Sequence, residues 1–226
     1  MKVEILNQPN NAIAHIFLKS NEEVIAKAGA MMMMSNNLQV STSMQRGSES
    51  TTTQKKSPLK DKFLFLNSFK ANEETGELYL APPIIGDIFV YQMTKYKLIV
   101  RVNAYLASSS KIEIFSGFHK FKTLLSNESN AWLSLVGDGQ VLINSFGRLS
   151  EVDVEDNFVI NLKNVIAFEN SLNFKLIFPQ TKGLASFIKK KESLCQFQGQ
   201  GKILYQTHSF KNFFADTQLE SSFKPS

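Results

Sequence analysis

Short apolar runs separated by polar turns follow one another along the chain, and one arrangement of them occurs three times. Residues 24–40, 98–114 and 158–174 align without gaps. In each stretch an apolar run leads to a small or turn-forming pair, then to a second apolar run, a polar turn and an alternating segment. Strand-length runs joined by tight polar turns are typical of β-hairpins. The pattern therefore predicts an all-β protein.

A second, glycine-containing phrase occurs twice. Residues 195–206 (CQFQGQGKILYQ) match residues 134–145 (SLVGDGQVLINS), with Gln196 opposite Ser134. Neither G-x-G pair opens a helix or precedes a Lys-Ser/Thr pair, as a phosphate-binding loop requires. We therefore interpret both as tight β connections that need the backbone freedom of glycine.

Together the two phrases define a module of a strand, a glycine turn, a second strand and the strand–turn–strand corner. One module spans residues 63–114 and another spans residues 132–174. The remaining pieces, residues 12–40 and 194–208, make a third module that is split between the chain ends. We expect the C-terminal strand to pair beside the N-terminal segment and to close a body of three pseudo-repeats, because closure removes exposed sheet edges.

The body, residues 1–208, is predicted to be a single domain, and two segments differ from it. Residues 45–62 are polar and lack apolar periodicity, which predicts a mobile loop between strands. Residues 209–226 form a C-terminal tail that contains several phenylalanines. The sequence leaves open whether the loop or the tail is functional.

Four consecutive methionines, residues 31–34, suggest a copper or haem site at first sight. In a strand, Met31 and Met33 face one way and Met32 and Met34 face the other, so the four sulfurs cannot converge on one ion. No Cys or His stands nearby to complete a ligand set. We interpret the run as a flexible filler of the hydrophobic core and predict no metal or other cofactor.

The net charge says little about which class of partner the protein binds. The formal net charge of +5 permits an anionic partner without requiring one. Candidates for contact with an anion or a nucleic acid are the basic residues of the polar loop and of one lysine run, namely Arg46, Lys55, Lys56, Lys60, Lys62, Lys189, Lys190 and Lys191.

Cys195 is the only cysteine, so the fold needs no oxidising compartment. No apolar run approaches the ~18 residues of a membrane span. The N-terminal segment shows neither a signal-peptide core nor a mitochondrial presequence. We therefore predict a cytoplasmic protein without a membrane span, or a mitochondrial one if the source is eukaryotic.

Five segments resemble the altered-inheritance-of-mitochondria family of tryptophan-RNA-binding-attenuation-protein-like proteins: EEVIAKAGAMMMMS, LYLAPPIIGDIFV, GDGQVLINSFG, NVIAFENSLNF and FQGQGKILYQT. The resemblance covers residues 1–208 and implies a double-stranded β-helix or attenuation-protein-like β-sandwich that oligomerises. The chain departs from the family at Lys163-Asn164, where Gly-His is common, and at residues 60–62, where Gly-Glu-Ser is common. The tryptophan- and RNA-binding residues of the attenuation protein find no matching motif here.

The chain contains no arrangement typical of a catalytic site. His15 stands among apolar residues, Cys195 flanks a strand, and the acidic residues 151–156 are typical of a solvated strand face or a turn. No nucleophile–base pair, zinc spacing or nucleotide-binding loop is present. We predict a non-enzymatic scaffold or interaction protein that forms homo-oligomers. Nucleic-acid binding through the basic loops and small-molecule binding inside the β body are the alternatives.

Overall fold

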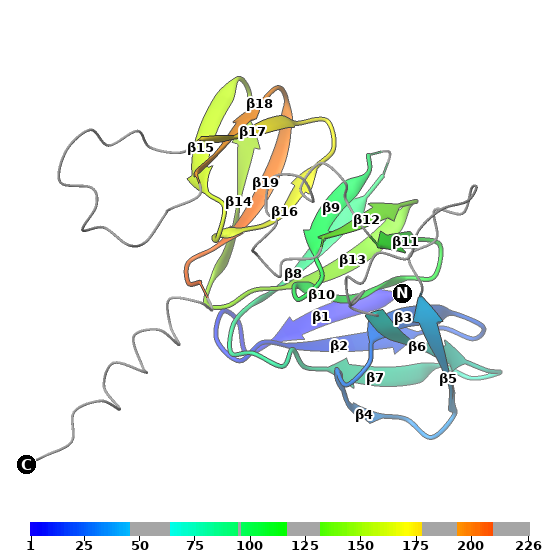
Figure 1. The fold of residues 1–226 in the computed structure, drawn as a ribbon. Coiled ribbons are helices and arrows are strands. Elements are labelled where there is room, and N and C mark those ends of the chain that lie inside the picture. The colour runs from blue at the N-terminus through cyan, green and yellow to red at the C-terminus, as the bar shows by residue number, and fades with distance from the viewer. Residues whose placement is uncertain (46–63, 95, 117–131, 178–193, 210–226) are drawn as a thin grey trace, which may run out of the picture.

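The computed structural model describes residues 1–45, 64–94, 96–116, 132–177 and 194–209. These residues form antiparallel β-sheets without a helix, as Figure 1 shows, so the prediction of an all-β protein is confirmed. The more specific assignment to a double-stranded β-helix stays a prediction.

Apart from the N-terminal strand β1 (Lys2–Leu6), the strands fall into three sets of six, which we call the first, second and third units. The first unit comprises β2 (Ile13–Leu18), β3 (Glu23–Lys27), β4 (Met31–Met34), β5 (Leu38–Gln45), β6 (Leu64–Ala71) and β7 (Gly76–Leu80). The second comprises β8 (Ile88–Met93), β9 (Leu98–Arg101), β10 (Tyr105–Ser109), β11 (Glu113–Ser116), β12 (Trp132–Val136) and β13 (Gly139–Asn144). The third comprises β14 (Leu149–Val154), β15 (Asn157–Asn161), β16 (Val165–Glu169), β17 (Asn173–Ile177), β18 (Leu194–Gln198) and β19 (Gly201–Gln206).

Each unit pairs its strands in the same way. The sixth strand lies between the first and the third, and the fifth lies between the second and the fourth. Each third strand also carries an irregularity at the same place, between Met31 and Met33, Tyr105 and Ala107, and Val165 and Ala167. Stretches 24–40, 98–114 and 158–174 thus occupy corresponding strands.

Neighbouring units are joined by one strand pair each. The second strand of the first unit, β3, pairs with β10, and β9 of the second unit pairs with β16. These two junctions create six-stranded sheets that cross from one unit to the next. The β9 and β16 strands are buried along nearly their whole length, which explains their continuous apolar runs in place of alternation.

The predicted joining of the N- and C-terminal strands is wrong. Strands β18 and β19 pair with β14 to β17, the strands that precede them in the chain, while β1 pairs with β2. The reason is that the two strands joined by each glycine-containing connection pair with strands that precede them in the same unit. The first unit therefore has its own closing strands, β6 and β7, which the sequence pattern assigned to the following module.

The hydrophobic core crosses the units. A central cluster contains Leu64 of the first unit, Leu133 of the second and Leu204 of the third, all buried. A second cluster joins the first unit to β10 and β13, and a third joins the third unit to Ile99 and Trp132. The units thus bury one another's apolar faces.

The two G-x-G segments are tight connections between β-strands, as predicted. Gly137 and Gly139 lie at the β12–β13 connection, with φ angles of +136° and +145°. Gly199 and Gly201 occupy the corresponding places between β18 and β19. A Cβ atom at Gly139 would stand 2.8 Å from Cβ of Ser109, so the sequence needs glycine there for space as well as for conformation.

Candidate functional site

The predicted anion-contact residues lie outside the part of the chain that the structure describes. This applies to Arg46, Lys55, Lys56, Lys60 and Lys62 and to Lys189, Lys190 and Lys191. Loop 45–62 is described only at Gln45, where β5 ends, and the tail only at Ser209. The nucleic-acid hypothesis therefore stays a prediction.

His15 takes part in a local cluster on the first sheet. Its Nε2 atom lies 2.9 Å from Oε2 of Glu77, and its ring stacks on Tyr79 with centroids 3.9 Å apart. Phe17 flanks the ring on the same strand. The environment of His15 combines a carboxylate hydrogen-bond partner with aromatic packing.

Cys195 and His208 also have structural surroundings. The Cys195 thiol is fully buried in the third core cluster, and burial raises its pKa to about 12. A thiol with so high a pKa is a poor nucleophile near neutral pH. The His208 ring packs against Phe146, and its Nδ1 atom lies 2.8 Å from the Thr207 hydroxyl. His119 lies outside the described residues.

A pocket of about 290 Å³, lined by aromatic and charged side chains, lies where the second and third units meet. The Tyr91 hydroxyl donates to Oε1 of Glu169 over 2.5 Å, and Oε2 of the same carboxylate accepts from the backbone N–H of Lys202 over 2.9 Å. Burial, followed by the Glu169 hydrogen bond, raises the pKa of Tyr91. The Lys202 ammonium lies 3.0 Å from Glu151 and 3.3 Å from Asp153.

Each charged group of the pocket thus has a partner, since the Lys202 ammonium pairs with Glu151 and Glu169 accepts two hydrogen bonds. Glu151 and Asp153 project from β14 into solvent, as the alternating acidic pattern predicted. Their hydrogen bonds raise the pKa of Lys202, which keeps its ammonium charged. We assign no ligand to this pocket. Within the described ranges, no group of three or more His, Cys, Asp or Glu residues could hold a metal ion.

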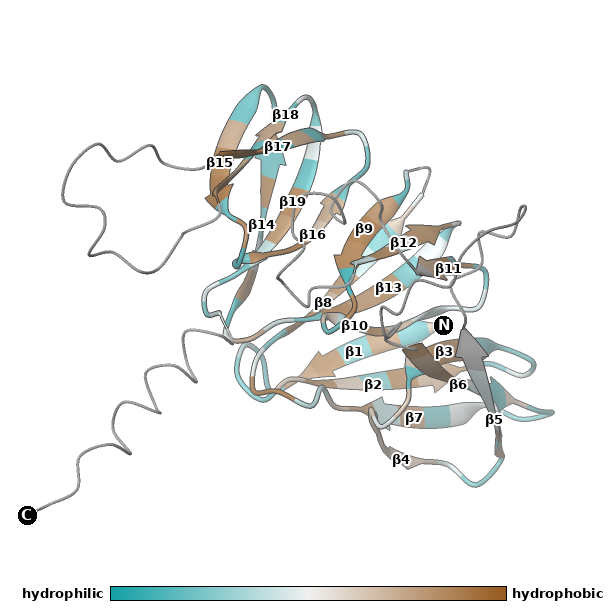
Figure 2. Cartoon of the chain, in the orientation of Figure 1, coloured by the Kyte–Doolittle hydropathy of each residue, from teal (hydrophilic) through white to brown (hydrophobic). Residues whose placement is uncertain are grey.

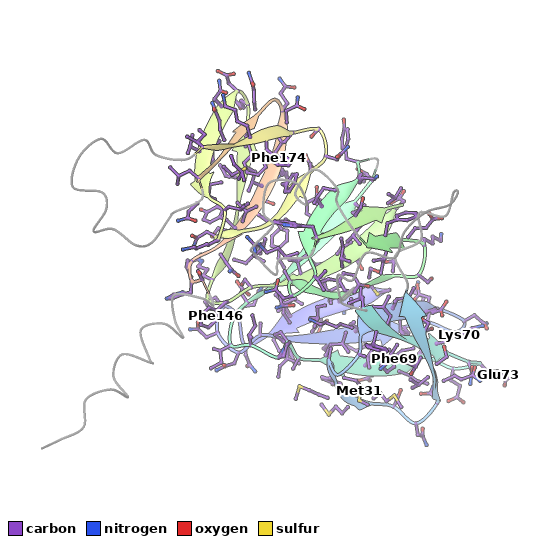
Figure 3. All side chains as sticks on the ribbon, viewed as in Figure 1. Met31, Phe69, Lys70, Glu73, Phe146 and Phe174 are labelled. Carbon is purple, nitrogen blue, oxygen red and sulfur yellow. The ribbon has the colours of Figure 1, made fainter. Side chains whose placement is uncertain are left out.

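The methionine run occupies an edge of the protein. All four side chains are exposed, with Met31 at 42%, Met32 and Met33 at 52% and Met34 at 37%. The prediction of a core filler is therefore wrong. The physical reason is that β4 pairs only with β7 among the described strands, whereas its counterparts β10 and β16 are covered by a neighbouring unit. Figure 3 shows Met31 projecting away from the ribbon, with other sulfur atoms along the same edge.

A second edge lies at the other end of the molecule. Within the described chain, β15 pairs only with β18, although its counterparts β3 and β9 each pair on both sides. Its side chains Phe158 and Val159 are among the exposed large hydrophobic residues. Figure 1 places β15 and β4 at opposite ends of the body, and Figure 2 shows that β4 is coloured toward the hydrophobic end of the scale.

These features define an all-β protein that ends in two exposed apolar strand edges. The chain belongs to the AIM24 family, described as mitochondrial biogenesis AIM24, whose pattern matches residues 3–208. The family resemblance seen in the sequence is thereby confirmed.

The fold is similar to that of a solved structure. It is the X-ray crystal structure of a Streptococcus pyogenes protein, which is 17% identical, has a TM-score of 0.74 and matches over 97% of this chain and 99% of its own. No curated protein matches this chain. Across the residues that the structure describes, no helix is long and apolar enough to cross a membrane.

Proposed function

We propose that the protein is a non-enzymatic, β-rich scaffold that self-associates through the exposed edge strand β4. The observation that carries the proposal is the exposure of four adjacent methionines on a strand with an unpaired side in the described chain. Exposed strand edges offer backbone hydrogen bonds to an added strand. Methionine side chains are flexible and polarisable, and they are common on surfaces that bind other proteins.

The candidate chemical groups support a role without catalysis. His15 contacts Glu77 and Tyr79, Cys195 is buried with a raised pKa, and the pocket's Lys202 pairs with Glu151. Each of these groups therefore has a structural explanation. Membership of the AIM24 family and the Streptococcus pyogenes fold are compatible with such a scaffold.

Light scattering after size-exclusion chromatography tests the proposal. We expect the mass of the wild-type protein to rise above that of a monomer with concentration, and the double variant Met31→Lys/Met33→Lys to remain monomeric. Ile85→Lys is the matched control, since Ile85 is 68% exposed but lies between strands β7 and β8. A wild-type protein that stays monomeric at every concentration would refute the proposal.

A further inference from the structure

The two internal junctions share one register. At the first, Ala107 lies opposite Ala26, and Ser108 lies opposite Ile25. At the second, Ala167 lies opposite Val100, and Phe168 lies opposite Ile99. The pairing is antiparallel in both cases, and each involves the second strand of one unit and the third strand of the next. Adjacent units therefore join by a single rule.

Each end of the molecule carries one half of that junction. Strand β4 corresponds to β10 and β16, because Met34 pairs with β7 as Ser108 pairs with β13 and Phe168 with β19. Strand β15 corresponds to β3 and β9, because Val159 stands where Ile25 and Ile99 stand against the fifth strand of the unit.

Exposure distinguishes the ends from the junctions. Phe168 and Ile99 are both fully buried where β16 meets β9, whereas Met34 and Val159 remain 37% and 52% exposed. Ser108, in the first junction, is also fully buried. The two ends thus expose apolar side chains at positions that are fully buried in the second internal junction.

At both ends, the backbone N–H and C=O groups point outward, as pairing with a further strand requires. The Ser35 N–H donates to the Glu77 carbonyl, so the polar backbone groups of Met34 face away from β7. The Gly199 N–H donates to the Asp156 carbonyl, so the backbone groups of Val159, three residues later, face away from β18. Among the described residues, both edges therefore present an N–H and a C=O without a strand partner at corresponding positions.

We infer that β15 of one copy adds antiparallel to β4 of a second copy, with Val159 opposite Met34 and Ile160 opposite Met33. The inference rests on the proposed self-association and identifies the partner surface. Since β4 and β15 lie at opposite ends of the folded molecule, the β4–β15 junction needs two molecules (Figure 1). The contact is head-to-tail, so repeated addition gives a ring if the rotation closes and a filament if it does not.

The partner that covers β4 is a second copy of the protein, because the strand that fits there is of the same type as β3 and β9. The strand that covers β10 is β3 and the strand that covers β16 is β9, and β15 is the remaining strand of that type. An additional bond follows from the internal template. The Asn170 N–H donates to the Lys97 carbonyl, and the corresponding groups across the new junction are the Asn36 N–H and the Asn157 carbonyl.

Disulfide trapping between two singly substituted proteins tests the register. A hydrogen-bonded antiparallel pair places Cα atoms about 5.5 Å apart, within the range that a disulfide spans. We expect Met34→Cys mixed with Val159→Cys to give a cross-linked heterodimer under mild oxidation, and neither protein alone to do so. Leu6→Cys mixed with Val159→Cys is the matched control on another edge strand, and the wild type controls for Cys195.

The outcomes separate this inference from the proposed function. If Met34→Cys alone cross-links, two β4 edges meet back to back; self-association then stands and the head-to-tail inference is overturned. If the wild type associates but the mixture gives no more cross-linked product than the Leu6→Cys control, the inference is likewise overturned. If the wild type does not associate, both fail.

A surface substitution gives an independent measurement. Val159→Lys places a charge in the junction, and we expect it to shift the association midpoint at least tenfold to higher concentration. Val136→Lys makes the same change on β12, at an exposed side chain away from both end strands. Equal association by the two variants would overturn the inference, and circular dichroism establishes that both are folded.

Discussion

The Arg101 guanidinium, on β9, donates through Nε to the backbone carbonyl of Val165, at the start of β16. A second donation reaches the Leu162 carbonyl, and the guanidinium lies 4.8 Å from the Trp132 ring centroid. Arg101 is buried, so a charged side chain of the second unit is fixed by backbone groups of the third. This contact holds the two units together beside their shared strand pair.

We expect Arg101→Met to lower the free energy of unfolding by about 2 to 4 kcal/mol, because hydrogen bonds to a buried charged group are each worth roughly 1.5–3 kcal/mol. Urea denaturation measures the loss. Arg148→Met is the control, since Arg148 is exposed and its substitution is expected to change stability by less than about 0.5 kcal/mol. Equal midpoints for the two variants would contradict the role of Arg101.

Gly139→Ala is expected to destabilise the protein more than Gly199→Ala. Both glycines have φ angles that other residues rarely adopt, +145° and +114°. Only at Gly139 does the added methyl also meet Ser109, because the closest atom at Gly199 is 3.5 Å away. The strained backbone costs about 1–3 kcal/mol in either variant. Thermal unfolding should therefore rank wild type above Gly199→Ala and Gly199→Ala above Gly139→Ala.

Tyr105 connects the first two units through its hydroxyl, which lies 3.1 Å from the Ile25 carbonyl and 2.9 Å from the Ser108 hydroxyl. We expect Tyr105→Phe to cost about 1–2 kcal/mol, since it removes a partner from buried polar groups. Tyr96→Phe, at an exposed tyrosine, should be nearly neutral in the same urea titration. If both variants unfold at the wild-type midpoint, the hydroxyl does not stabilise the junction.

Cys195 should resist thiol reagents in the native protein at pH 8 and react fully once the chain is unfolded. Burial raises its pKa to about 12, so the folded state favours the protonated thiol. The associated stability is complete below the unfolded pKa, near 8.5, and is lost as the pH rises from there toward 12. Labelling at pH 8 with and without urea checks the first statement, and rapid native labelling would contradict it.

Hydrogen peroxide should oxidise residues 31–34 well before Met93. The four edge methionines are exposed, whereas Met93 is only 1% exposed and serves as an internal control. Sulfoxide formation makes the side chain polar, so oxidation should also weaken self-association. Peptide mass spectrometry measures the order of oxidation, and similar rates for Met31 and Met93 would contradict the exposed edge.

The elements were predictable where local chemistry fixes them. The apolar run of residues 12–19 and the glycines beside β13 and β19 indicate the strand and the tight connections directly. The strand partners were not predictable in the same way, because the two strands of residues 194–206 have the same apolar pattern whether they pair with the third unit or the first. Only the pairing with β14 and β16 decides this.

The candidate site shows the same limit. Apolar residues at 31–34 fit a buried strand or an edge strand equally well, and exposure depends on whether another unit covers β4. Arg101 was missed although a signal was present, since a charge within the apolar run of residues 98–102 needs a buried partner. Its partners are backbone carbonyls, which carry no sequence signature.

The central cluster has a consequence for protein synthesis. It gathers Leu64 and Leu204, so residues from an early and a very late part of the chain share one core. A nascent chain that ends before β19 lacks Leu204, and one edge of β16 then has no strand to pair with. The central core is therefore completed only after β19 has been synthesised, and until then its apolar strands are exposed to aggregation.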